Sequence, residues 1–310
     1  MKATKFLKIG LILITTAGLS LTGCQKEKQK DNSPDSSSLQ QLSQDDNFAE
    51  NVNDEAMNDV NALLSGGGNL KSTNFWPCNA TIDSTAVVND TITFYITYDG
   101  YSCNGKLLRT GKIEIKKKVG TKWHDAGATV IVTYINLQIT RVSNGKSITI
   151  NGTRTFQNVT GGVLWQLGNQ YTSIVHKIWG TMVVTFDNDS TRSWNIARQR
   201  TFTGTMGQLL MTVDGFGTEG NFNNLVVWGI NRNGENFYTQ ITQPVVFRET
   251  CSWNPVSGIK IHQIPSNDKK ATITFGYNSN NEPVVGDECP TKYRLDWEKG
   301  THSGTVYLWL

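Results

Sequence analysis

The sequence predicts an all-β fold, an antiparallel meander of about sixteen strands preceded by a short amphipathic helix. From about residue 82 to the end, runs such as Thr91–Tyr98 and Ala271–Tyr277 are rich in β-branched and aromatic residues and alternate in polarity. Turn dipeptides such as Asn144-Gly145 separate the runs, and no stretch long enough for a crossover helix lies between them. Neighbouring strands are therefore expected to pair antiparallel, in a sandwich or a barrel-like sheet.

The first residues have the features of a secretory leader. Three lysines precede an apolar run from Ile9 to Leu21, which is too short to span a bilayer as a stable helix. Leu-Thr-Gly-Cys at 21–24 resembles the bacterial lipobox, which implies cleavage before Cys24 and acylation of its thiol and new amino group. Several acyl chains, each contributing roughly 0.8 kcal/mol per buried CH₂, would hold the protein on a membrane. A plain secretory signal with an incidental cysteine is the alternative.

Composition divides the rest of the chain into four segments. A polar stretch rich in Gln, Lys, Asp and Ser is expected to form a flexible tether. Apolar residues then recur at three- and four-residue steps from Phe48 to Leu64, which predicts an amphipathic helix that ends at the glycines after Ser65. The predicted boundaries are 1–23 for the leader, 24–44 for the lipidated cysteine and tether, 45–65 for the helix, 66–81 for a linker and 82–310 for the β domain.

A weak internal repeat is visible in the β region. Thr-Ile-Thr-Phe occurs at 91–94, before Cys103, and recurs at 272–275, before Cys289. Two related halves with a break near residues 204–224 would explain the repeat. Chance similarity between hairpins of like composition is the alternative.

The charge of the chain indicates no nucleic-acid partner. Removal of the leader takes away three lysines and leaves 26 basic and 26 acidic residues. A neutral chain with both signs interspersed offers no electrostatic footprint for nucleic acid or for an anionic membrane surface. The expected membrane contact is through the lipid anchor alone.

Four cysteines remain once Cys24 is acylated, and export predicts disulfides among them. Three connectivities are possible, and sequence proximity favours Cys78 with Cys103 and Cys251 with Cys289. Free buried thiols are an alternative. Zinc binding is disfavoured because the chain has no Cys-x-x-Cys and no histidine pair at ligand spacing.

Several motifs together resemble a known group of proteins. The acidic helix after the cysteine, Arg-Thr-Gly-Lys-Ile at 109–113, Gly-Thr-Arg-Thr-Phe at 152–156 and the final Thr-Ile-Thr-Phe-Gly-Tyr strand are similar to uncharacterised, β-rich lipoproteins of Bacteroidetes cell envelopes. The resemblance implies an outer-membrane lipoprotein and names no activity. Gln-Lys-Glu-Lys at 25–28 is similar to the surface-export signal of that group, and this leaves the surface and the periplasmic face as alternatives.

Three sites resemble the O-glycosylation sequon that such bacteria use on exported proteins. They are Asp83-Ser84-Thr85, Asp90-Thr91-Ile92 and Asp189-Ser190-Thr191, with Ser84, Thr91 and Ser190 as the acceptors.

No catalytic residue, metal ligand or cofactor is predicted. Hydrolase, zincin and nucleotide-binding signatures are missing, and Gly215–Gly220 matches a dinucleotide pattern without the helix that such a site needs. The four histidines, His124, His176, His262 and His302, stand singly among strands. The densest acidic group, Asp287, Glu288, Asp296 and Glu298, is expected to be turn and edge-strand charge.

The predicted function is a lipid-anchored envelope protein with a non-catalytic structural or binding role. Nine tryptophans, Trp76, Trp123, Trp165, Trp179, Trp194, Trp228, Trp253, Trp297 and Trp309, carry the alternative of carbohydrate binding, which requires three or more of them on one exposed face. Trp123, next to His124 and Asp125, is expected to be an exposed stacking residue. An envelope glycosidase is the second alternative and requires two carboxylates about 5–10 Å apart in a cleft. The possible partners are therefore a glycan or another envelope protein.

Overall fold

The structure, a computed structural model, describes residues 34–65 and 77–310. One helix, α1 (Pro34–Ser65), precedes fifteen strands, so the all-β prediction is confirmed with one strand fewer than expected. The strands are β1 (Ala80–Ser84), β2 (Thr91–Tyr101), β3 (Leu107–Lys118), β4 (Ala128–Arg141), β5 (Ser147–Asn158), β6 (Ile174–Phe186), β7 (Thr191–Thr203), β8 (Leu210–Gly215), β9 (Gly217–Glu219), β10 (Phe222–Ile230), β11 (Asn236–Arg248), β12 (Asn254–Ile264), β13 (Lys269–Tyr277), β14 (Lys292–Lys299) and β15 (His302–Trp309). Three short 3-10 helices, η1 (Leu164–Gln166), η2 (Glu249–Cys251) and η3 (Pro265–Asn267), lie in loops.

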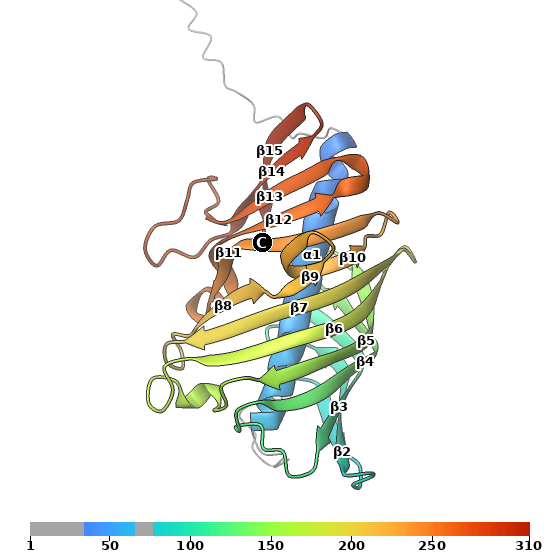
Figure 1. Ribbon diagram of the computed structural model, residues 1–310, viewed down its shortest axis with the longest axis vertical. Coiled ribbons are helices and arrows are strands. Elements are labelled where there is room, and N and C mark those ends of the chain that lie inside the picture. The colour runs from blue at the N-terminus through green and yellow to red at the C-terminus, as the bar shows by residue number, and fades with distance from the viewer. Residues whose placement is uncertain (1–33, 66–76) are drawn as a thin grey trace, which may run out of the picture. The chain divides into compact units, whose positions relative to one another are not determined.

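All fifteen strands belong to one antiparallel sheet (Figure 1). The strands follow chain order from β1 to β7 and from β10 to β15, because tight turns join most neighbours. Two short strands, β8 and β10, share the space between β7 and β11, and each of them pairs with β7 on one side and with β11 on the other. The sheet therefore continues through residues 204–224, where the sequence suggested a break between two halves.

The sheet has a buried inner face and a polar outer face. In β7, the side chains of Arg192, Trp194, Arg198 and Arg200 are buried, while those between them are mostly half-buried. This alternation is the period-two pattern of the sequence, with one difference. Several inner positions hold arginine where an apolar residue would be expected.

Glycines in mid-strand bend the sheet. Gly152, Gly180 and Gly229 have φ angles of +138°, +148° and +152°, which residues other than glycine rarely adopt. A Cβ at Gly180 would lie 2.3 Å from the carbonyl oxygen of Thr153 on the neighbouring strand. Because the three glycines lie in β5, β6 and β10, these three strands can bend without a steric clash and the sheet can curve.

Helix α1 lies against the inner face and begins earlier than predicted. Residues 34–44 are helical, so the flexible tether expected there is wrong for that stretch. Leu39 and Leu42 are 0% and 3% exposed, and they pack into the same core as the strands. Burial of these leucines stabilises a stretch that looks too polar to fold. The last residue of the helix is Ser65, and the glycines that were expected to end it lie outside the described residues.

The contacts of α1 extend across the sheet. Ser38 near its start accepts a hydrogen bond from Lys269 of β13 at 3.0 Å. Asp59 near its end accepts one from Tyr98 of β2 at 2.8 Å. In Figure 1 the helix accordingly crosses the strands rather than running along them. Among the described residues, no helix has both the length and the apolar character needed to span a bilayer.

Both predicted disulfides are confirmed. Cys78 bonds to Cys103 and Cys251 bonds to Cys289, with Cα atoms 5.1 and 5.3 Å apart. The first bond ties the start of the sheet to the β2–β3 turn, and the second joins the loops that follow β11 and β13. Closing loops of 25 and 38 residues by such bonds contributes roughly 3–4 kcal/mol each through the unfolded chain.

Candidate functional site

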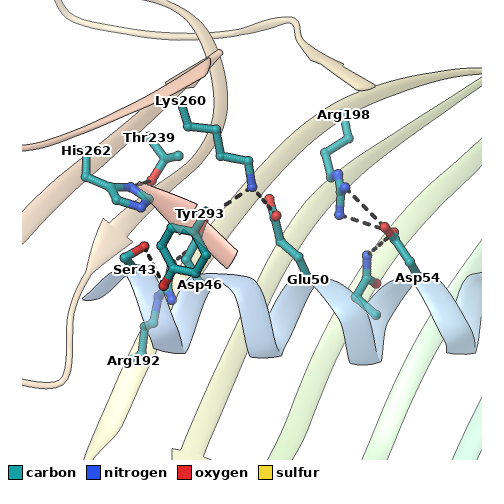
Figure 2. A network of polar contacts seen from close by, with 11 residues as sticks. Ser43, Asp46, Glu50, Asp54, Arg192, Arg198, Thr239, Lys260, His262 and Tyr293 are labelled. Atoms are coloured by element: carbon teal, nitrogen blue, oxygen red, sulfur yellow. Dashed lines mark hydrogen bonds and ion pairs between the residues drawn. The ribbon is translucent and has the colours of Figure 1, made fainter. Parts of the chain in front are cut away.

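The most unusual chemistry of the molecule lies between α1 and the inner face of the sheet. The helix carries seven Asp and Glu and no Lys or Arg. Asp46, Glu50 and Asp54 recur every four residues and so share one side of the helix. Opposite them, Arg192, Arg198 and Lys260 project from inner positions of β7 and β12 (Figure 2). We call this set of contacts the helix–sheet network.

The N-terminal part of the network has balanced charge. Asp46 Oδ1 accepts a hydrogen bond from Arg192 Nη2 at 2.7 Å, and its Oδ2 lies 3.8 Å from Lys260 Nζ. Lys260 donates a short hydrogen bond to Glu50. Arg232 forms a bidentate pair with Asp45, at 2.6 and 2.7 Å. Three carboxylates thus face three cations.

Burial and charge change the pKa values of these groups in opposite directions. Burial raises the pKa of the Glu50 carboxyl, and the nearby Lys260 ammonium only partly offsets it. Burial also acts on Asp46, but Arg192 and Lys260 outweigh it, so the pKa of Asp46 is held below its usual value. The pKa of the buried His262 falls to about 4, because burial disfavours its charged form. His262 is therefore neutral at pH 7, and its Nδ1 lies 2.8 Å from Thr239 Oγ1.

In the middle of the network cations exceed carboxylates. Arg198 forms two hydrogen bonds to Asp54, each 3.2 Å long, and Arg200 lies 3.8 Å from the same carboxylate. Arg154 of β5 is 1% exposed, and none of its three nitrogens has a hydrogen-bond partner among the described residues. Its guanidinium carbon lies 5.1 Å from the ring centre of Tyr134 and 5.2 Å from that of Trp194. Cation–π attraction to these two rings is thus what stabilises its charge within the described part of the chain.

The C-terminal part of the network contains one ion pair, between Arg109 and Asp59. Arg109 donates to Asp59 at 3.0 Å and to the carbonyl oxygen of Cys78 at 3.1 Å. A hollow of about 10 Å³, enough for one water molecule, lies beside it, lined by Glu55, Tyr98 and neighbouring apolar side chains. This hollow is too small for an organic ligand.

Such a network positions the helix more than it stabilises the fold. Buried ion pairs lose much of their Coulomb attraction to desolvation, and replacing them with packed apolar side chains is often neutral or stabilising. Removing one partner alone is costly, because a buried charge is left uncompensated. The pairing of Asp46, Glu50 and Asp54 with particular strands therefore fixes the position and rotation of α1 on the sheet.

The outer face carries a second feature, an aromatic patch formed by Trp179, Phe216, Phe222, Trp228 and Tyr238. Phe222 stacks on Tyr238 with ring centres 4.1 Å apart and planes at 14°. Trp179 meets Phe216 edge to face at 6.4 Å. Trp228 is paired with Tyr238 on one side and Asn195 on the other, so its ring lies on the same face as theirs. These five side chains are half-buried or exposed.

Uncharged polar side chains surround part of the patch. Thr181 lies opposite Asn195 and donates a hydrogen bond to its Oδ1 at 2.9 Å. On the other side, Gln263 lies opposite Tyr238 and donates to Gln240 at 2.8 Å. Aromatic rings flanked by amides and hydroxyls can stack on sugar rings and bond their hydroxyl groups.

Trp123 does not have the expected position. Its side chain is 3% exposed, and its Nε1 donates to Asn61 Oδ1 of α1 at 2.8 Å. The expectation of an exposed stacking residue is therefore wrong, although its neighbours His124 and Asp125 are exposed. The loop turns the ring inward because it packs on Phe156, with ring centres 4.6 Å apart.

The other tryptophans are spread over the molecule. Trp194 and Trp297 are buried, Trp179, Trp228 and Trp253 are half-buried, Trp165 and Trp309 are exposed, and Trp76 lies outside the described residues. Two tryptophans rather than three share the aromatic patch. The carbohydrate alternative thus keeps a candidate site, but at residues that the sequence did not single out.

The histidines and the acidic group form no metal-binding cluster in the part of the chain that the structure describes. His176 and His262 are buried, whereas His124 and His302 are exposed. Within residues 34–65 and 77–310, no three His, Cys, Asp or Glu side chains come together as metal ligands would. The predicted acidic group is surface charge: Asp287 pairs with Arg248, Asp296 with Arg294, and Glu298 with Lys270, while Glu288 is exposed.

The predicted modification sites have different settings. Cys24 lies outside the described residues. Ser84 is exposed at the end of β1, and Thr91 and Ser190 are half-buried beside turns. Ser190 Oγ lies 2.6 Å from Asn188 Oδ1, and Thr91 Oγ1 lies 3.3 Å from the carbonyl oxygen of Asn89. The three hydroxyls stay candidates for glycosylation.

Sequence reasoning missed the helix–sheet network, although signals for it were present. Arg192, Arg198 and Arg200 share one parity within β7, and Trp194 and Ile196 of the same parity mark that side as the core. Acidic residues at four-residue spacing in a helix without basic residues are the complementary signal. Together these patterns predict an acidic helix against a basic sheet face.

Comparison of the chain with protein-family models, with curated proteins and with solved structures found no match.

Proposed function

We propose that this protein is a lipid-anchored cell-envelope protein with a non-catalytic structural or binding role. The observation that carries the proposal is the pair of disulfides, because such bonds persist in oxidising compartments outside the cytosol. They agree with the leader and the lipobox-like sequence before Cys24. The resemblance to Bacteroidetes lipoproteins points to the outer membrane.

The inner face supports a scaffold role. Its curved surface is filled by α1, and the most deeply buried acids, Asp46 and Glu50, contact cations of the sheet. The surfaces left for a partner are then the outer face, the loops and the two edge strands β1 and β15, each of which pairs with a single strand in the described chain.

The anchor is tested by replacing Cys24 with Ser in the exporting bacterium. The variant should leave the membrane fraction and appear as soluble, disulfide-bonded protein, because only the acylated residue is lost. Cys103→Ser is the matched control, since it removes a cysteine without touching the anchor and should remain membrane-bound. A Cys24→Ser protein that still sediments with membranes in high salt would refute the anchor.

The second candidate function is glycan binding at the aromatic patch. Its support is the stacked pair Phe222 and Tyr238 beside Trp228, with Asn195 and Gln263 on either side. The rings offer flat apolar faces, and the amides offer both donors and acceptors.

A glycan array read with the soluble Cys24→Ser protein tests this candidate. Binding should disappear in Trp228→Ala and Tyr238→Ala. It should persist in Tyr95→Ala, which removes a half-buried outer-face aromatic ring of β2. An array without signal, or a signal that the patch variants leave unchanged, would leave only the structural or protein-partner role.

A further inference from the structure

Two arginines, Arg198 and Arg200, contact the Asp54 carboxylate at the centre of the helix–sheet network, and Arg154 interacts with it only at longer range. Arg198 and Arg200 are 0% exposed and Arg154 is 1% exposed, so water screens none of them. Asp54 is the carboxylate within reach, and both of its oxygens already accept hydrogen bonds from Arg198. The neighbouring acids of the helix, Asp46 and Glu50, contact Arg192 and Lys260 instead. The centre of the network thus has two positive charges in excess.

Hydrogen-bond donors exceed acceptors at the same place. All three nitrogens of Arg154 lack a partner among the described residues, as do Nε and Nη2 of Arg200 and Nε of Arg198. A guanidinium can only donate, so these groups cannot satisfy one another. His176, which is buried and lies opposite Arg200 in the neighbouring strand, also has both ring nitrogens unpartnered.

The surrounding residues offset this charge only in part. Tyr134 and Trp194 offer Arg154 cation–π contacts worth about 2 kcal/mol each, but an uncompensated buried charge costs several kcal/mol and the in-plane N–H groups of Arg154 stay without acceptors. Like charges add to the penalty, since Arg198 and Arg154 both act to lower the pKa of Arg200, which burial brings to about 10. Buried polar groups without partners are rare in native proteins, and an ordered water or an ion that completes their hydrogen bonds is one explanation for them.

We propose that Arg154, Arg198 and Arg200 form a buried site for a small inorganic anion of about the size of chloride. A monovalent anion would accept hydrogen bonds from the unpartnered guanidinium nitrogens and remove half of the excess charge. Water could satisfy the donors but not the charge. An organic anion does not fit the surroundings, because the aromatic side chains of Tyr134, Phe156 and Trp194 there are all buried.

The anion would join the helix to the middle of the sheet. Arg154 lies in β5 and the other two arginines in β7, while Asp54 belongs to α1. Binding to the folded state alone raises stability with anion concentration. The inference concerns the interior and does not depend on the proposed function.

Crystals of the mature, oxidised protein grown in bromide test the site directly. Anomalous scattering should show one bromide within hydrogen-bonding distance of Arg154 and of Arg198 or Arg200. A water molecule there, or no ordered density between these side chains, would overturn the proposal.

Thermal unfolding of the same protein gives an independent readout. At constant ionic strength, the unfolding midpoint should rise as chloride or bromide replaces a large organic anion. This rise should vanish in Arg154→Met and persist in Arg294→Met, which removes an outer-face arginine paired with Asp296. If Arg154→Met does not fold, the unmodified protein alone still tests the proposal, because a thermal unfolding midpoint that does not depend on the halide concentration would contradict the anion site.

Discussion

The ion pair between Glu50 and Lys260 gives the sharpest prediction about how α1 is held. Both side chains are buried, at 3% and 2% exposure, and they contact each other directly. Glu50→Leu leaves Lys260 with the more distant Asp46, and Lys260→Met removes the ion-pair partner of Glu50. Each single change should lower the free energy of unfolding by about 3–5 kcal/mol, the usual cost of an uncompensated buried charge.

The double variant Glu50→Leu with Lys260→Met should behave differently. It removes both charges and fills their space with apolar side chains, while Asp46 keeps its hydrogen bond from Arg192. Its stability should lie between that of the parent and about 1–4 kcal/mol above it. The two single changes should therefore be strongly non-additive, with a coupling energy of at least about 6 kcal/mol, the sum of the two smallest expected single losses.

Urea unfolding of the soluble Cys24→Ser protein, followed by far-UV circular dichroism, measures these differences. The matched control is the exposed pair Lys270 and Glu298, whose charged atoms lie 3.9 Å apart. The equivalent changes at this pair, Lys270→Met and Glu298→Leu, should each alter the free energy of unfolding by no more than about 0.5 kcal/mol, and their effects should be additive. If the inner double variant loses as much stability as its two single changes together, the charges do not compensate each other and the reasoning fails.

Three further predictions concern the same core. His262 should make the protein less stable in acid, because its folded pKa of about 4 lies below the ordinary histidine pKa of 6.5. Between these pH values the unfolded chain binds a proton that the folded protein does not, so about 3 kcal/mol of stability is lost as pH falls. His262→Gln should reduce this loss in urea titrations from pH 7 to 4, and an unchanged slope would show that the residue is not a neutral buried histidine. Gly180→Ala should lower the free energy of unfolding by at least about 2 kcal/mol, because this glycine has a φ of +148° and lies close to the backbone of the neighbouring strand. The control Gly145→Ala, in an open turn, should lower it by less. Equal effects of the two changes would argue against the mid-strand bend. Trp123→Phe should cost about 1–3 kcal/mol by leaving Asn61 without its donor, and a stability equal to that of the parent protein would indicate that the ring is not buried against α1.

Much of the fold could be predicted from the sequence, because strands in a one-sided sheet produce local signals. Alternation in Thr91–Tyr98 and the Asn-Gly turn at 144–145 mark a strand and a hairpin without knowledge of the rest of the chain. The two disulfides could be predicted from the even number of cysteines and from their proximity in the sequence. The start of the helix could not be predicted, because residues 34–44 look like a polar tether. Only in the folded structure do Leu39 and Leu42 pack on apolar side chains of the sheet.

The site was harder to predict because its residues meet only in three dimensions. Arg198 lies 144 residues from its partner Asp54, so neither residue marks the other in the sequence. Basic residues in a strand are ordinarily assigned to its solvent face, and the acidic helix that covers β7 had no visible connection to it. Trp123 was misassigned for a similar reason: its polar neighbours are exposed, but its own partner Asn61 lies on a distant helix.

Hydrogen exchange of the backbone amides of α1 is the decisive test of whether this acidic helix is an integral part of the core of the sheet. Amides from Leu42 to Leu63 should exchange only on global unfolding, with the same protection free energy as amides of β7 and β12 in the soluble Cys24→Ser protein at pH 7. Exchange of these helical amides at much lower free energy than the strands, with the strands still protected, would show that the helix is not part of the core.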